Sequence, residues 1–227
     1  MNRYRHEYKY FLDCRMEQIL QIRAAGILMR DTHVKSDGTY LIRSLYFDDF
    51  HDSCMTENDA GTDPRSKFRI RYYNHDTSRI RLEKKSKTRG MTLKESCAIS
   101  EEECRGLMSG EVPEISDTMS TVKQKLLLEM QMRGLMPKVI VSYERIPFIY
   151  PGGNVRVTFD RKISSSSESN LFLDGNYAER PILPLGNSIL EVKWDEVLPL
   201  HIKDVLKLDE LQWTAFSKYY MCRLYHI

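Results

Sequence analysis

The chain has 227 residues, and its 34 lysines and arginines almost balance its 32 aspartates and glutamates, for a formal net charge of +2. Hydrophobic residues make up 41% and charged residues 29%, a composition that excludes disordered, collagen-like and low-complexity proteins. So small a net charge gives no overall field for nucleic acid, and any anion site must come from local charge placement. The length fits one large domain over residues 1–227.

Cysteine and histidine usage indicates a reducing compartment. The five cysteines are odd in number and form no Cys-x-x-Cys motif, and the six histidines lack metal-ligand spacing. These patterns argue against a disulfide framework and against a zinc site. The N-terminus has no apolar signal-peptide core, and no apolar run approaches the roughly 18 residues of a membrane span. We therefore expect a cytoplasmic chain with no transmembrane segment and leave open whether it has a membrane partner.

The first half of the chain is predicted to be mostly strands. Alternation of charged and aromatic residues predicts a strand over 4–12, followed by a helix over 15–25 that Asp13 caps and Gly26 ends. A strand follows over 39–48, and then a polar loop over 51–64. The next three strands alternate strictly and predict a β-meander over 67–73, 79–87 and 91–97.

The second half mixes helices with strands. Ser100 and Glu103 form a capping box that opens a short helix to about Met108. The elements expected after it are a helix over 120–133, a strand over 138–149 interrupted near Pro147, a strand over 155–160, a serine-rich loop over 164–169, a strand over 189–194, and two helices between about 200 and 225.

The unusual feature is the placement of charge. At least five strands carry two or more charged residues on one face: Glu7 and Lys9; Lys67, Arg69 and Arg71; Arg81, Glu83 and Lys85; Arg156 and Asp160; Glu191 and Lys193. Each face by itself could be an ordinary solvated sheet surface. The opposite faces are apolar, however, and the predicted helices can cover them. If the strands close on themselves, the charged faces line a lumen.

A lumen lined by arginine and lysine needs an anion, because buried like charges are costly. Arginine matches phosphate oxygens with two parallel hydrogen bonds, and carboxylates would hold Mg²⁺ or Mn²⁺. The chain has no Gly-x-Gly-x-x-Gly motif, no Walker A loop and no nucleophile elbow. Basic strands with aromatic residues could also suggest single-stranded nucleic acid, but most of the 13 tyrosines fit core or tunnel support better.

Eight short motifs together resemble one known family. In chain order they are residues 5–10 (RHEYKY), 44–48 (SLYFD), 67–72 (KFRIRY), 82–85 (LEKK), 142–145 (SYER), 155–160 (VRVTFD), 190–193 (LEVK) and 217–219 (SKY). They resemble the vacuolar transporter chaperone (VTC) domain, a polyphosphate polymerase among the triphosphate tunnel metalloenzymes, or CYTH superfamily. The hydrolases and cyclases of that superfamily begin with Glu-x-Glu-x-Lys. Arg5 stands at the first of these positions, which favours the polymerase branch.

The resemblance implies an α+β fold with a closed antiparallel β-barrel tunnel of about eight strands and helices packed outside. It implies an ATP–polyphosphate phosphotransferase that needs Mn²⁺ or Mg²⁺ and binds ATP, inorganic polyphosphate, triphosphate or pyrophosphate, and no nucleic acid. The residues carried over as catalytic are Lys9, Arg69, Arg71, Lys85, Arg145, Arg156 and Lys218. Further phosphate-binding residues would be Lys67, Arg81, Lys94 and Lys193, and the metal ligands Glu191, Glu83 and Glu7.

Two other functions remain open. An inorganic tripolyphosphatase would use the same tunnel with an activated water as nucleophile. A non-catalytic polyphosphate-binding module would keep the arginines without a competent metal site.

Overall fold

One antiparallel sheet contains every strand of the computed structural model, which describes residues 4–226. The strands are β1 (His6–Leu12), β2 (Met29–Arg30), β3 (Tyr40–Asp48), β4 (Arg65–Tyr73), β5 (Asp76–Thr88), β6 (Met91–Ile99), β7 (Met136–Tyr150), β8 (Val155–Ser166), β9 (Arg180–Pro181) and β10 (Ser188–Trp194). Eight of them follow the order β1-β10-β8-β7-β3-β4-β5-β6, while β2 pairs with β7 and β9 with β8.

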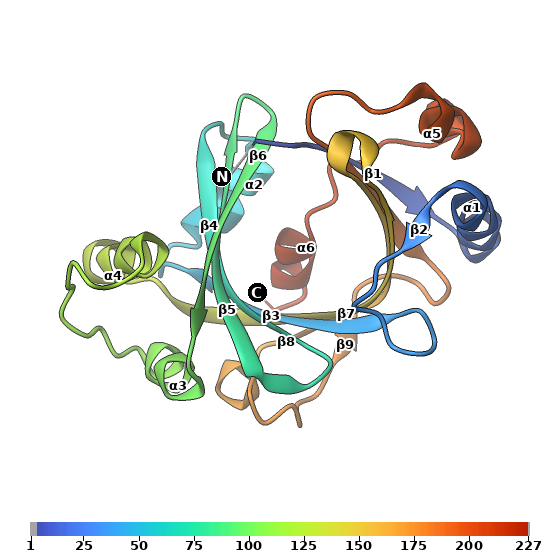
Figure 1. Ribbon diagram of the computed structural model, residues 1–227. Helices are drawn as coiled ribbons and strands as arrows, with labels where there is room; N and C mark the ends of the chain where they lie inside the picture. Colours follow the sequence, from blue (N-terminus) through green and yellow to red (C-terminus); the bar gives the residue numbers. More distant parts are fainter. Residues whose placement is uncertain (1–3, 227) are drawn as a thin grey trace.

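The sheet curls strongly but stays open, so the expectation of a closed barrel is wrong (Figure 1). Within residues 4–226, the two edges of the sheet meet at a single bridge, between Arg5, the residue before β1, and Thr92 of β6. Further along β1, the chain near the C-terminus takes the edge instead: Tyr10 bridges Trp213, and the Thr214 amide donates to the Lys9 carbonyl over 2.9 Å. At Lys9 and Tyr10 the edge of β1 is therefore paired with the chain near the C-terminus and not with β6.

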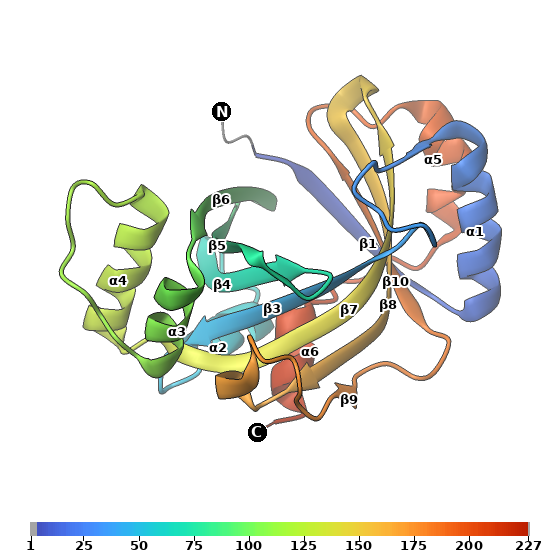
Figure 2. The same ribbon diagram turned by 60° about the horizontal axis from the view of Figure 1, so that its bottom comes forward.

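Helices cover the convex face of the sheet at two places. They are α1 (Cys14–Ile27) and α5 (Leu200–Val205) over the β1, β10 and β8 side, and α3 (Glu101–Ser109) and α4 (Thr121–Arg133) over the β5 and β6 side (Figure 2). Short 3-10 turns lie at Gly152–Asn154, Ser169–Leu171 and Leu208–Glu210. Each helix pair buries one face against alternating strand residues; Leu126 and Leu127 of α4, for example, pack with Phe68 and Ile70 of β4.

Two further helices, α2 (Ser53–Asp59) and α6 (Lys218–Leu224), lie on the concave face, where α6 is seen inside the curl of the sheet (Figure 1). Their buried residues Cys54, Tyr219 and Cys222 pack against β3 and β7 side chains such as Ile42 and Val141. The pair therefore closes part of the concave face with an apolar cluster and leaves the rest to polar groups. None of the helices within residues 4–226 is long and apolar enough to cross a membrane.

Most predicted elements are present, and four local expectations are wrong. Gly26 does not end the first helix, which runs on to Ile27. The segment 51–64 is not a loop throughout, because the Asp48 carboxylate accepts the amides of Cys54 and Met55 and so fixes the first turn of α2. Strand β7 runs through Pro147, which stays in register with Thr158. The serines at 164–166 belong to β8 and are buried, not in a loop.

The outer helical layer gives a stability prediction. Leu126 is fully buried between α4 and the sheet, so Leu126→Ala should lower the free energy of unfolding by about 2–5 kcal/mol. Met132 on the same helix is 75% exposed, and Met132→Ala should change it by less than about 0.5 kcal/mol. Urea denaturation of both variants measures the difference, and equal losses would contradict the packing of α4 on the sheet.

Candidate functional site

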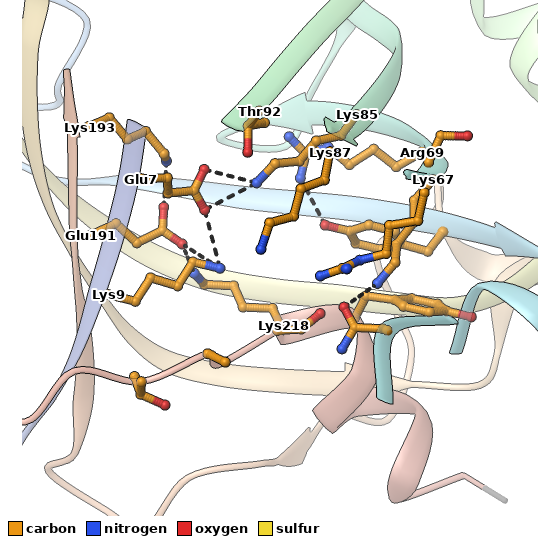
Figure 3. A pocket seen from close by; sticks show the side chains of 18 of the residues that line it. Glu7, Lys9, Lys67, Arg69, Lys85, Lys87, Thr92, Glu191, Lys193 and Lys218 are labelled. Carbon is orange, nitrogen blue, oxygen red and sulfur yellow. Dashed lines mark hydrogen bonds and ion pairs between the residues drawn. The ribbon is translucent and has the colours of Figure 1, made fainter. Parts of the chain in front are cut away.

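A cavity of about 400 Å³ lies in the concave face of the sheet, between β1, β4, β5, β7 and β10 and the two helices α2 and α6. Its charged lining is mostly cationic, as Figure 3 shows in part. Lining side chains with a positive charge are Lys9, Arg65, Lys67, Arg69, Arg71, Lys85, Lys87, Arg145, Lys193 and Lys218; the lining carboxylates are Glu7, Asp59 and Glu191.

Strand alternation and register bring these charges together. In the β1–β10 ladder, Glu7 is opposite Lys193 and Lys9 is opposite Glu191, so each carboxylate faces an amine on the neighbouring strand. In the β4–β5 ladder, Lys67 is opposite Lys85. Every second residue of these strands points to the concave face, and the residues between them fill the outer clusters.

The two lining glutamates sit among amines. Glu7 lies 3.0 Å from Lys85 and 3.2 Å from Lys9, while Glu191 lies 2.5 Å from Lys193 and 2.7 Å from Lys218. Burial by itself would raise the pKa of both carboxyls, but the surrounding charges outweigh it. Lys85, Lys193 and Lys9 hold the pKa of Glu7 well below its usual range, and Lys193, Lys218 and Arg145 do the same for Glu191.

The arginines are held by hydrogen bonds from several strands. Arg69 contacts the buried Glu83 over 2.6 Å and donates to the Tyr46 hydroxyl over 2.8 Å. Arg71 donates to Ser44 of β3 over 2.9 Å and to the Tyr143 hydroxyl of β7 over 3.0 Å. Each guanidinium therefore has one orientation at the cavity wall.

On the opposite wall, Arg145 donates from Nε and Nη2 to the two oxygens of Asp160, each over 2.6 Å. Lys218, the first residue of α6, lies 2.5 Å from Asp160 and is 8% exposed. The burial of Lys218 would lower its pKa, but the charges of Asp160 and Glu191 raise it above the usual range. Both cations are therefore charged at neutral pH.

Helix α6 owes its place to α2 and the residues before it. The Tyr219 hydroxyl donates to Asp48, the Tyr220 hydroxyl donates to Asp59 over 2.6 Å, and Arg223 donates to Asp52 over 2.6 Å. These bonds link segments more than 150 residues apart in the sequence. They fix the N-terminus of α6, and with it Lys218, at the cavity.

Four lysines that line the cavity have depressed pKa values, and the shift is large for Lys67 and Lys85. Burial lowers the pKa of Lys67 to about 7, although the Asn58 side-chain oxygen accepts a hydrogen bond from it over 2.8 Å. Burial also lowers the pKa of Lys85 to about 8, despite the neighbouring Glu7. Both amines thus lack enough negative charge from the protein to hold their protons firmly.

The structure gathers most of the sequence-predicted site residues around this cavity: Glu7, Lys9, Lys67, Arg69, Arg71, Lys85, Arg145, Glu191, Lys193 and Lys218. Four others lie outside its lining. Arg81 and Arg156 are exposed, and Lys94 and Glu83 form an ion pair of 3.1 Å. Arg156 is still opposite Lys193 in the β8–β10 ladder, one strand away from the cavity.

Sequence reasoning missed several groups. Asp160 stands on the charged face of its strand but was not expected in the site. Strand alternation predicts the face on which a residue lies, but it does not predict which side chains that residue contacts. Tyr46 and Tyr143 were expected only as support, and Asn58 lies in a segment expected to be a loop. Lys87 follows Lys85 at a spacing of two residues, a signal that could have identified it.

A metal ion would find few protein ligands here. Within residues 4–226, no three His, Cys, Asp or Glu side chains are grouped so that they could hold one. Glu7 and Glu191 are nevertheless close, since Lys9 lies 3.2 Å from the first and 4.0 Å from the second. Two carboxylates suit Mg²⁺ or Mn²⁺ when phosphate oxygens and water complete the coordination. The donor set therefore fits a cation that binds together with phosphate.

Comparisons with solved structures show the same fold at low sequence identity. A protein described as a putative adenylate cyclase from Bacillus halodurans has 14% identity and a TM-score of 0.55, with 95% of each chain covered. The putative adenylyl cyclase HpAC1 from Hippeastrum, described as having a dominant triphosphatase activity, has 15% identity and a TM-score of 0.53, with 99% of this chain and 96% of that chain covered.

The Mediator head module of Schizosaccharomyces pombe also contains a similar chain, with 10% identity, a TM-score of 0.50, and 92% of this chain and 97% of that chain covered. The comparison with curated proteins found no match. The family model described as the VTC domain matches residues 4–226, which is nearly the whole chain. The chain therefore belongs to the VTC domain family.

Proposed function

We propose that this chain is a polyphosphate polymerase domain that transfers the γ-phosphate of ATP to a growing polyphosphate chain. The observation that carries the proposal is the surplus of cations around one cavity of a VTC domain. Such a surplus is costly unless a polyanion neutralises it. A triphosphate or polyphosphate supplies closely spaced negative charges along its length, and arginine and lysine at these spacings suit it.

Phosphoryl transfer needs positioning and charge neutralisation more than covalent help. In the proposed step a terminal oxygen of polyphosphate attacks the γ-phosphorus of ATP, the bond from that phosphorus to the β,γ-bridging oxygen breaks, and ADP leaves. Arg69, Arg71 and Arg145 would orient the phosphates, and Lys9, Lys85 and Lys218 would neutralise them. A divalent cation held by Glu191 and Glu7 would draw charge from the phosphate oxygens.

Arg5 supports the polymerase over the hydrolase. Superfamily hydrolases are expected to carry a glutamate at this position, and here the Arg5 guanidinium pairs with Asp195 over 2.9 Å. The position thus adds no carboxylate that could bind a metal or activate water. A tripolyphosphatase remains the second candidate, because the similar Hippeastrum protein is described as having triphosphatase activity.

The product separates the candidate functions. Incubation of the protein with ATP and Mn²⁺ should yield long polyphosphate chains on a polyacrylamide gel. Release of free phosphate without chains would contradict the polymerase and favour the tripolyphosphatase. Binding of tripolyphosphate with neither product would indicate a module that only binds polyphosphate.

The metal role of Glu191 is testable by an isosteric change. Glu191→Gln should lower Mn²⁺-dependent turnover by about 100-fold or more. It should still bind metal-free tripolyphosphate with a dissociation constant close to that of the wild type, because Asp160 continues to hold Arg145 and Lys218 when Glu191 loses its charge. Glu210→Gln, at a side chain that is 70% exposed, is the matched control. Normal turnover by Glu191→Gln would show that the metal assignment is wrong.

The role of Arg71 is testable by thermal melting. A ligand at ~100 times its dissociation constant stabilises the folded state by about 2.7 kcal/mol. Arg71→Ala should lose most of the rise in melting temperature that tripolyphosphate causes, since its guanidinium lines the cavity. Arg23→Ala, at an exposed position of α1, should keep the full rise. Equal shifts in both variants at two salt concentrations would contradict binding in this cavity, because screened surface charges respond alike.

Affinity should also depend on pH through Lys67. Its pKa is lowered to about 7, and a bound polyanion must raise it, so binding takes up a proton near and above neutral pH. The affinity for tripolyphosphate should therefore fall as pH rises from about 6 to about 9. Lys67→Gln should weaken this dependence, and comparison with the wild type cancels the titration of the ligand. Calorimetry in two buffers of different ionisation enthalpy counts the protons, and identical pH profiles would contradict the role of Lys67.

A further inference from the structure

Two buried carboxylates lie on the concave face of the sheet, beside the residues that line the cavity. Glu83 of β5 is 1% exposed and Asp160 of β8 is fully buried, and neither is among the residues that line the cavity. A buried carboxylate needs cationic partners, because water no longer stabilises its charge. In both cases those partners include an arginine that does line the cavity.

The two contacts have a common geometry. Glu83 Oε2 accepts from Arg69 Nε over 2.8 Å and lies 2.6 Å from Nη2. Asp160 accepts from Arg145 Nε and Nη2, each over 2.6 Å. In each pair the carboxylate holds the same edge of the guanidinium, the edge formed by Nε and Nη2. The third nitrogen of Arg69, Nη1, is directed to the Tyr46 hydroxyl in the cavity wall.

Each carboxylate also forms an ion pair with a lysine. The second oxygen of Glu83 is 3.1 Å from Lys94, and Asp160 Oδ2 is 2.5 Å from Lys218. All these contacts are made by protein groups, so they do not depend on a ligand. A guanidinium fixed in this way loses little conformational freedom when a phosphate binds to it.

We propose that Glu83 and Asp160 are positioning residues that direct Arg69, Arg145 and Lys218 toward a polyphosphate in the cavity. The proposal deepens the proposed function and rests on it. Glu83 was expected to be a metal ligand, but it lies outside the cavity lining, which contains Glu7 and Glu191. We therefore assign it the positioning role instead.

A purely electrostatic role and a positioning role of Asp160 predict opposite changes in anion affinity when its carboxylate is lost. If the carboxylate acted only through its charge, its removal would make the cavity more positive and strengthen anion binding. If it positions Arg145 and Lys218, its removal frees both side chains and weakens binding. The amide of asparagine has the same shape as the carboxylate, but its NH₂ group opposes an N–H donor of Arg145 or Lys218.

Isothermal titration calorimetry with tripolyphosphate in the absence of metal shows whether the loss of Asp160 strengthens or weakens anion binding. Asp160→Asn should raise the dissociation constant about tenfold or more. Glu144→Gln is the matched control: Glu144 holds Arg161 over 3.0 Å and Lys162 over 2.7 Å, on β7 and β8 but outside the cavity lining. It removes the same charge and should change the dissociation constant less than about twofold. Unchanged or tighter binding by Asp160→Asn would overturn the proposal.

A second measurement tests the positioning role in the wild type without any ligand. It therefore stays informative if a variant fails to fold or if the wild type binds no phosphate. In the ¹⁵N spectrum of the wild-type arginine side chains, the Nε–H signals of Arg69 and Arg145 should exchange slowly with water. Arg69→Lys and Arg145→Lys assign the two signals, and Glu83→Gln should remove the protection of Arg69 alone. Rapid exchange of both signals in the folded wild type would overturn the positioning role. Absence of tripolyphosphate binding by the wild type would instead contradict the proposed function.

Discussion

Charged side chains that leave water must be paired, and this requirement shapes the concave face of the sheet. The concave faces of β1 and β10 are complementary in charge, because Glu7 lies opposite Lys193 and Lys9 lies opposite Glu191. A slip of one residue in either strand would turn its charges into the apolar outer cluster and its apolar residues into the cavity. The ion pairs and the outer core therefore specify the same register.

The charges in the cavity lining do not balance, because cations outnumber carboxylates there. Glu7 and Glu191 each serve several amines, while burial depresses the pKa of Lys67 and Lys85. The protein thus supplies enough negative charge to fold around its arginines and too little to neutralise the site. A polyanion would complete the balance, and this electrostatic deficit is the physical basis for the proposed phosphate chemistry.

The fold by itself does not decide this chemistry. Solved structures at 10–15% identity share it, and they include proteins described as cyclases and a chain of the Mediator head module. The proposed chemistry depends instead on the side chains that line the cavity and on the buried carboxylates beside them. Asp160 and Glu83 are these carboxylates, and each pairs with an arginine that lines the cavity.

The sequence by itself determined which strand residues share a face, and it located the capping residues Asp13 and Ser100. Alternation in β4 separated Lys67, Arg69 and Arg71 from the apolar residues between them because side chains of a strand point alternately to its two faces. Order and spacing of the charged motifs also sufficed to suggest the family to which the chain belongs.

Only the tertiary structure decided what each charge meets. Alternation carries no information on strand order, so the neighbourhood of β1 and β10, and hence the pairing of Lys9 with Glu191, appears only in the folded sheet. The place of α6 depends on Asp48, Asp52 and Asp59, more than 150 residues earlier in the chain, and the chain around the distant Thr214 occupies the edge of β1. Such contacts join residues far apart in the chain, and their free energy exists only when the whole sheet has formed.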